Sequence, residues 1–167
     1  MSHLARFGVL LLALVPMWPD AVAQDAAKQK PPRRFGFEVD ETTYPQKSPA
    51  EAMKSIAILL DRGRVDYLLA HLSDPSYVDH WVERYKANFP QGKADARHLL
   101  AFDRLVRETT KYFDNDPLIV KDLRMFAKEA KWSEEGNVAT GSVDTIPARK
   151  VFLRKIGERW FLENKQE

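Results

Sequence analysis

The chain has 167 residues, of which 26 are basic and 24 acidic, and it contains no cysteine. Its formal net charge of +2 argues against a specific nucleic-acid-binding protein, because such proteins gather a clear basic excess on one face. The missing cysteines exclude disulfides, thiol nucleophiles, cysteine-ligated zinc and iron–sulfur clusters. A chain of this length can bury a core of its own, so its stability has to come from packing.

Residues 1–23 have the three parts of a cleavable secretory signal peptide. A short basic start precedes an apolar run over residues 7–15, and the Ala-Val-Ala of residues 21–23 is the small-x-small pattern that leader peptidases cut. An uncleaved membrane anchor is the alternative, but a span needs about 20 apolar residues and Pro16 interrupts this run much earlier. Cleavage near Ala23 predicts an extracytoplasmic protein, periplasmic or secreted, with no transmembrane span after processing.

Residues 24–47 are expected to form a flexible, polar and basic tether. The cluster from Lys28 to Arg34 contains two adjacent prolines and is too polar to fold alone. It could attach the protein to anionic lipid or cell-wall polymer, although a solvated linker is the simpler interpretation. Phe35, Phe37 and Tyr44 are apolar enough for the end of the segment to lie on the domain in an extended form.

Residues 48–167 are expected to form one α+β domain that opens with four to five helices. Ser48-Pro49-Ala50-Glu51 is a capping box with proline at the first helical position, and it predicts a helix that ends at Gly63. A short helix is expected next. Asp74-Pro75 and Asp116-Pro117 each predict a further helix start, with another long helix between them.

The hydrophobic period changes at Lys131, and the segments that follow predict an antiparallel β-meander. Glu135-Gly136-Asn137 and Gly157-Glu158 are its turns, and the latter suits a two-residue type II′ hairpin. This turn sets the register of the last two strands, so that Lys155 lies opposite Trp160 and Leu153 opposite Leu162. The face that should meet the helices carries Val151, Leu153, Trp160 and Leu162.

The opposite face of the last hairpin is half apolar. Two phenylalanines and an isoleucine among charged residues predict that the tail, an envelope protein partner or a second copy covers this face. Three residues of this face are therefore candidate binding residues: Phe152, Arg154 and Phe161. The full face consists of Phe152, Arg154, Ile156, Arg159, Phe161 and Glu163. Trp160, on the face that should meet the helices, is a further candidate because it could line an aromatic pocket.

Three motifs near the C-terminus share a pattern with a known superfamily. Gly-Asn-Val-Ala-Thr at 136–140, Val-Phe-Leu-Arg-Lys at 151–155 and Gly-Glu-Arg-Trp-Phe-Leu at 157–162 resemble the closing strands of nuclear transport factor 2-like domains. The resemblance implies a cone in which helices pack into a curved antiparallel sheet, here incomplete because only three or four strands are predicted. Such cones bind a small ligand, catalyse isomerisation or dehydration, or only assemble. Residues 48–69 separately resemble the first helices of exported bacterial proteins that have no assigned activity.

The sequence contains no motif that identifies an enzyme. It lacks a nucleophile elbow, a phosphate-binding glycine loop, a dinucleotide fingerprint and a His-Glu-x-x-His helix. Asp95 and His98 lie three residues apart on one helical face, where the carboxylate could orient the imidazole as a general base. A surface ion pair is the simpler interpretation of that spacing. No cofactor and no metal site are expected.

Trp81 and Tyr85 lie one helical turn apart and could line an aromatic pocket, although core packing is the simpler interpretation. The leading hypothesis is a non-catalytic extracytoplasmic module that binds a small apolar or aromatic ligand, binds a protein partner or associates with itself. A small cone-pocket enzyme using Asp95 and His98 is the first alternative. An envelope-associated protein attached through its basic tail is the second.

Overall fold

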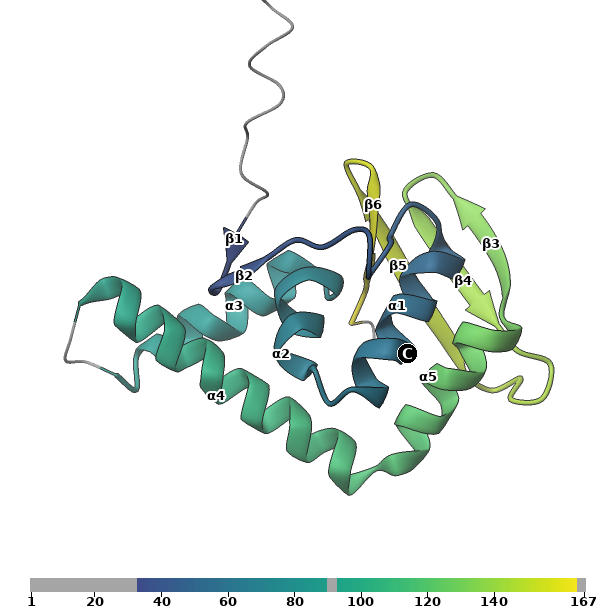
Figure 1. The fold of residues 1–167 in the computed structure, drawn as a ribbon. Helices are drawn as coiled ribbons and strands as arrows, with labels where there is room; N and C mark the ends of the chain where they lie inside the picture. Colours follow the sequence, from purple (N-terminus) through teal and green to yellow (C-terminus); the bar gives the residue numbers. More distant parts are fainter. Residues whose placement is uncertain (1–32, 90–92, 165–167) are drawn as a thin grey trace, which may run out of the picture. The chain divides into compact units, whose positions relative to one another are not determined.

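The computed structural model describes residues 33–89 and 93–164 (Figure 1), so the predicted signal peptide lies outside the described part. The fold class is α+β, as the sequence predicts. Five helices precede a four-stranded antiparallel sheet, and a hairpin of two short strands, β1 (Arg33–Arg34) and β2 (Phe37–Glu38), precedes the helices. None of the helices in the described ranges is both long enough and apolar enough to cross a membrane.

Helix α1 (Pro49–Asp61) begins at the predicted capping box. The Ser48 hydroxyl accepts a hydrogen bond from the Glu51 amide, and the Glu51 carboxylate accepts one from the Ser48 amide, each at 3.2 Å. Two backbone donors that the first helical turn leaves unpaired are thereby satisfied. The helix stops two residues before Gly63, close to the predicted end.

The short helix α2 (Val65–Tyr67) continues into a π-helical turn, η2 (Leu68–Leu72), which the sequence does not predict. The Ser73 amide donates to the carbonyl of Leu68, five residues earlier, at 2.9 Å. This wider turn brings the end of η2 beside strand β6 (Arg159–Leu162). There the Asp74 amide donates to the Leu162 carbonyl at 2.8 Å, so the helical and β parts are joined by backbone bonds.

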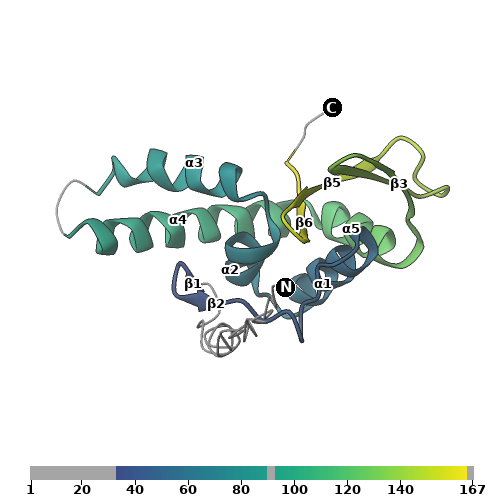
Figure 2. The ribbon, with the colours of Figure 1, turned by 90° about the horizontal axis from the view of Figure 1, so that it is seen from above.

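Helices α3 (Pro75–Lys86) and α5 (Pro117–Glu129) begin at the two predicted Asp-Pro starts. In both, the aspartate side chain accepts from the amide two residues later, at 2.9 Å for Asp74 and 3.2 Å for Asp116. Helix α4 (Ala94–Asn115) lies between them in the chain. It packs antiparallel to α3, whereas α5 turns away from α4 and packs along α1 (Figures 1 and 2).

The sheet is a sequential meander of β3 (Lys131–Glu135), β4 (Val138–Ser142), β5 (Lys150–Ile156) and β6. Leu153 pairs with Leu162 and Lys155 with Trp160, which confirms the predicted register. Gly157 has a φ of +60° while Glu158 does not have a positive φ, which fits the predicted type II′ turn.

The apolar residues form two clusters that meet at α2 and η2. The first cluster lies between α1, α5 and the inner face of the sheet, and it includes Met53, Ile56, Phe126, Leu153 and Trp160. The second lies between η2, α3 and α4, and it includes Leu69, Val78, Val82, Phe102 and Leu105. The meeting of these two clusters positions the site described below.

Residues 33–47, the described part of the expected tether, pack on the folded domain, and we call them the N-terminal strap. The Phe35 ring stacks on Phe102 with centroids 4.0 Å apart, and Phe37 packs against both apolar clusters. Tyr44 is buried in the first cluster. The ordered fold therefore begins before Ser48, and residues 24–32 of the expected tether lie outside the described part.

Gln46 fixes the end of the strap and is only 2 % exposed. Its side-chain amide donates to the carbonyls of His71 at 3.1 Å and Trp160 at 2.8 Å, and its oxygen accepts from Arg159. The Trp160 amide donates in turn to the Gln46 carbonyl at 2.9 Å. The strap thus covers the edge of β6 that faces away from β5.

The second face of the last hairpin is more covered than the sequence suggests, and much of the cover comes from the chain itself. Phe161 is 7 % exposed and lies beneath the Arg159 guanidinium, 5.1 Å from the ring centroid. Glu163 is buried and pairs with Arg154. Of the apolar residues on this face, Ile156 is the one that stands out as exposed, at 43 %.

Candidate functional site

A cleft of about 560 Å³ opens where the α3–α4 pair, α5 and the end of β6 come together. This volume falls within the range of about 300–1,000 Å³ that is typical of small-molecule sites. Five aromatic rings line it, and we call it the aromatic cleft: Tyr77, Trp81, Tyr85, Tyr112 and Phe113. Its aliphatic walls are Leu68, Leu69, Leu105, Ile119, Leu123 and Leu162.

Helical spacing brings the rings together. Tyr77, Trp81 and Tyr85 follow one another at four-residue intervals on α3, with neighbouring centroids 6.4 and 5.5 Å apart. Positions four apart lie on the same helical face. All three rings are half-buried, because one side packs on the second apolar cluster while the other lines the cleft.

A hydrogen-bonded pair stands at the α3–α4 end of the aromatic cleft. The Tyr85 hydroxyl donates to the Glu108 carboxylate, which also accepts from Arg104 at 2.8 Å. Burial, reinforced by the Glu108 carboxylate, raises the pKa of Tyr85 to about 12. The hydrogen bond from Tyr85, followed by that from Arg104, lowers the pKa of Glu108. At neutral pH the phenol is therefore protonated and the carboxylate ionised.

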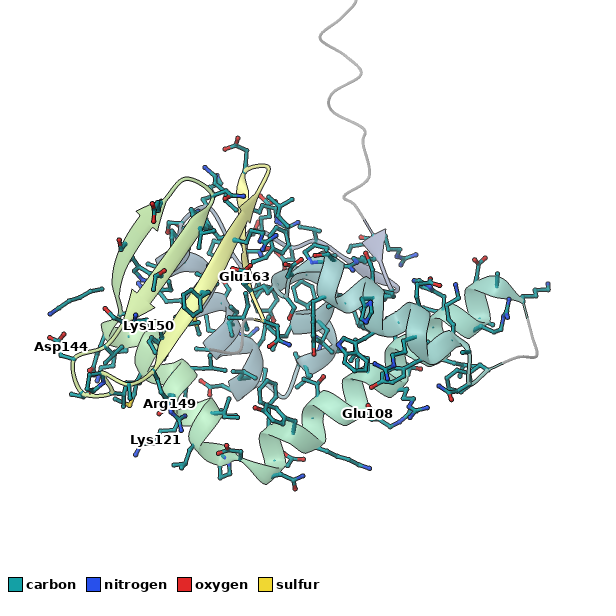
Figure 3. The ribbon with its side chains drawn as sticks, turned by 180° about the vertical axis from the view of Figure 1, so that it is seen from behind. Glu108, Lys121, Asp144, Arg149, Lys150 and Glu163 are labelled. Atoms are coloured by element: carbon teal, nitrogen blue, oxygen red, sulfur yellow. The ribbon has the colours of Figure 1, made fainter. Side chains whose placement is uncertain are left out.

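A second charged group closes the cleft near β6, where Figure 3 shows Glu163 between the sheet and the helices. Its carboxylate is buried and pairs with Arg154, and this contact raises the pKa of the guanidinium. The Nε of Arg154 lies 3.9 Å from a carboxylate oxygen of Asp74, which is also buried. One arginine therefore contacts both acids, and Asp74 also accepts from the Ser76 amide at the start of α3.

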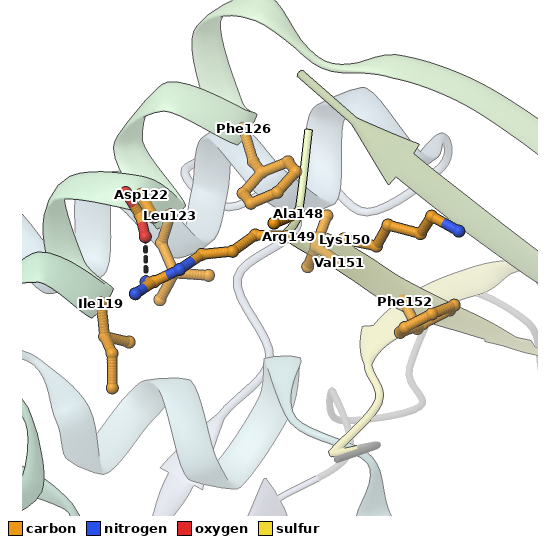
Figure 4. A pocket seen from close by; sticks show the side chains of 9 residues that line it. All are labelled: Ile119, Asp122, Leu123, Phe126, Ala148, Arg149, Lys150, Val151 and Phe152. Carbon is orange, nitrogen blue, oxygen red and sulfur yellow. Dashed lines mark hydrogen bonds and ion pairs between the residues drawn. The ribbon is translucent and has the colours of Figure 1, made fainter. Parts of the chain in front are cut away.

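A smaller cavity of about 240 Å³ adjoins the aromatic cleft between α5 and the start of β5 (Figure 4). Phe126, Val151 and Phe152 provide its apolar walls. An ion pair between Asp122 of α5 and Arg149 crosses its edge. The two cavities share a wall that consists of Ile119, Leu123 and Lys150.

The structure does not bring Asp95 and His98 together as a pair at a cavity. The His98 ring stacks on Phe35 with centroids 5.1 Å apart, and its Nδ1 lies 3.8 Å from a carboxylate oxygen of Glu83. Asp95 is exposed near the start of α4. Neither residue lines the aromatic cleft or the smaller cavity.

The binding residues that the sequence suggests lie in different places in the structure, and only some of them line a cavity. Trp81 and Tyr85 line the aromatic cleft, and Phe152 lines the smaller cavity. Trp160 and Phe161 are buried, the former in the first apolar cluster, and Arg154 is held by its two acids. These three residues do not line either cavity.

The sequence does not identify the α4 side of the cleft as a binding surface. Leu105, Thr109 and Tyr112 continue one helical face past the residues that pack on α3. Leu105 is buried, whereas Tyr112 is 57 % exposed although it is large and aromatic. The apolar face of α4 extends beyond the helix that packs on it, and such an excess of apolar face is the sequence signal that indicates a binding surface.

Within the described ranges, no three His, Asp or Glu side chains are grouped so that they could hold a metal ion. No protein-family model matches the chain, and no curated protein or solved structure matches it either. Function is therefore inferred from the geometry of the cleft.

Proposed function

We propose that this protein is an exported, non-catalytic module that binds a small, mainly apolar ligand in the aromatic cleft. The observation that carries the proposal is the cleft itself, with a ligand-sized volume and five aromatic rings in its walls. Aromatic rings supply large apolar contact area together with a few polar atoms that can orient a ligand. The predicted signal peptide supports an extracytoplasmic location.

The protonation states in the cleft favour binding over catalysis. A general acid or base works best with a pKa near the operating pH. The pKa of Tyr85 is raised and that of Glu108 is lowered, so both move away from neutrality. Glu163 is held by Arg154, and no histidine lines the cleft.

The resemblance to nuclear transport factor 2-like domains is part of this proposal. In that superfamily the ligand lies in the cone formed by the helices and the sheet. The aromatic cleft lies between α3, α4 and α5 on one side and the end of β6 on the other. A partial cone of this kind would be closed by the α3–α4 pair.

The test begins with native mass spectrometry of the mature chain, starting at Gln24, after gentle purification from its own host. A non-covalent extra mass that disappears on denaturation is the expected result. Titration with anilinonaphthalene sulfonate then measures the occupancy of the cleft. Thr109→Phe fills the cleft and should weaken probe binding by about tenfold or more, whereas Lys111→Phe, on the exposed side of the same helix, should not.

Two results would count against the proposal. One is the absence of both an extra mass and any probe binding. The other is equal probe affinity in wild type, Thr109→Phe and Lys111→Phe, which would locate the probe outside the cleft.

A further inference from the structure

The aromatic cleft and the smaller cavity form one elongated surface, because Ile119, Leu123 and Lys150 belong to both. Along α4 the lining residues run from Leu105 to Phe113, about 12 Å at 1.5 Å per residue. Along α5 they run from Ile119 to Phe126, about 10 Å by the same rise. A compact ring system would occupy only part of this path.

Two of the three residues that the cavities share are apolar. Ile119 and Leu123 lie one turn apart on α5, and both are half-buried while they line the two cavities. Phe126 and Val151 continue this wall at the end of the smaller cavity, and both are buried. Such a wall suits a hydrocarbon chain, because a hydrocarbon chain needs no hydrogen-bond partners.

Positive charge gathers at the smaller-cavity end, where Figure 3 shows Lys121, Arg149 and Lys150 around the start of β5 and the first half of α5. Asp122 neutralises Arg149. In the part of the chain that the structure describes, neither Lys121 nor Lys150 has an ion-pair partner. Both lysines are exposed, and Lys150 lines both cavities.

The acids of the aromatic cleft are already compensated. Glu108 accepts from Arg104 and Tyr85, and Glu163 pairs with Arg154. The uncompensated charge along the path is therefore positive, and Lys150, which carries it, lies where the smaller cavity joins the aromatic cleft. This polarity matches a ligand with an apolar chain and a terminal anion.

We propose that the ligand is a single-chain anionic amphiphile, with its carboxylate or phosphate beside Lys150 and its chain along the Ile119–Leu123 wall toward the aromatic rings. The inference rests on the proposed function of the cleft and adds the class of ligand. The chain supplies most of the affinity, because each methylene removed from water strengthens binding by about fourfold. The exposed lysines supply the preference for an anionic head.

The experiment measures displacement of anilinonaphthalene sulfonate from the mature protein by octanoate, laurate and palmitate, each below its micelle concentration. Affinity should rise by about fourfold per added methylene and level off once the wall is filled. Palmitate should bind better than hexadecylamine, which has a chain of the same length and the opposite charge. Hexadecyl phosphate distinguishes a phosphate head group from a carboxylate. If it binds more tightly than palmitate, the ligand is a lysophospholipid, and if it binds more weakly, the ligand is a free fatty acid.

Two pairs of variants locate the ligand. Ile119→Trp blocks the shared wall and should weaken the binding of palmitate by about tenfold, while the binding of octanoate changes little. Leu118→Trp, at an exposed neighbouring position, should weaken the binding of neither. Lys150→Glu should remove the preference for palmitate over hexadecylamine. Lys54→Glu, an exposed lysine of α1 that lines neither cavity, should retain it.

The possible failures are distinguishable. If the probe binds and Thr109→Phe weakens it, but affinity does not depend on chain length, the cleft is a binding site and the amphiphile inference is wrong. Equal or tighter binding of hexadecylamine also overturns the inference. If neither the probe nor any chain binds, the proposed function fails as well. The series on wild-type protein decides these outcomes even if Ile119→Trp does not fold.

Discussion

Gly141 lies near the end of β4, where two side chains approach its backbone closely. A Cβ atom added at this position would lie 2.8 Å from Cγ1 of Val151 and 2.9 Å from Cζ3 of Trp132. Contacts below 3.0 Å force a neighbour to move. Trp132 is half-buried and can turn outward, but Val151 is buried in the first apolar cluster and has little room. We therefore expect Gly141→Ala to destabilise the protein mainly through Val151.

The sign follows from two opposing effects. Replacing glycine within a strand by alanine gains about 0.5–1 kcal/mol, because the unfolded chain loses conformational freedom. Overpacking a close-packed core by one methyl costs about 1–3 kcal/mol. The free energy of unfolding should therefore fall by about 1 kcal/mol, the difference between the central values of these two effects, about 2 and about 0.75 kcal/mol.

Urea unfolding monitored by circular dichroism measures this change from the midpoint, provided that the slope stays constant. Val151→Ala removes the nearest contact, so the double variant should lose about 1 kcal/mol less than the sum of the two single losses. A Gly141→Ala protein as stable as wild type would refute the reasoning. Strict additivity of the two substitutions would do the same.

Three further predictions concern the strap and the sheet. Gln46→Ala leaves the His71 and Trp160 carbonyls and the Arg159 guanidinium without this partner, so the free energy of unfolding should fall by about 2 kcal/mol or more. The exposed control Lys47→Ala should change it by less than about 0.5 kcal/mol. Equal urea midpoints for the two variants would contradict this prediction. Burial lowers the pKa of His71 in the folded protein, whereas in the unfolded chain this histidine has its ordinary pKa of about 6.5. The unfolded chain therefore binds a proton at a higher pH than the folded protein does. The free energy of unfolding should be greatest above about pH 6.5 and should fall as the pH decreases below it. Urea midpoints at about pH 7.5 and about pH 5.5 should show a smaller decrease in His71→Gln than in wild type. Phe161→Ala should cost about 3–5 kcal/mol because the ring is buried, but Ile156→Thr should cost less than about 0.5 kcal/mol, which makes Ile156 the better probe of self-association by sedimentation.

The features that the sequence predicted well are those decided by neighbours in the chain. Ser48 and Glu51 are three residues apart, and Asp74 and Asp116 cap the helices that begin at the next residue. The register of β5 and β6 follows from the Gly157-Glu158 turn alone. Each of these signals acts within a few residues, so no tertiary context was needed to read it.

The features that the sequence did not predict depend on distant partners. Gln46 looks like a linker residue, and its burial follows from bonds to His71 and Trp160 that no local pattern indicates. His98 stacks on Phe35 of the strap instead of pairing with Asp95. Likewise, Glu108 and Tyr112 look like solvated helix positions until α3 and α5 are placed beside them.

The bond between Gln46 and Trp160 spans 114 residues of sequence, so the strap and the last strand can meet only after nearly the whole domain has been made. Contacts of such long range slow folding, because the loop must close before the contact can stabilise it. A chain that emerges from its amino end would therefore lack the contact between the Gln46 end of the strap and β6 until β6 arrives. If the predicted signal peptide directs export of the unfolded chain, this late closure would delay premature folding, and in the folded protein the same contact ties the start of the fold to its end.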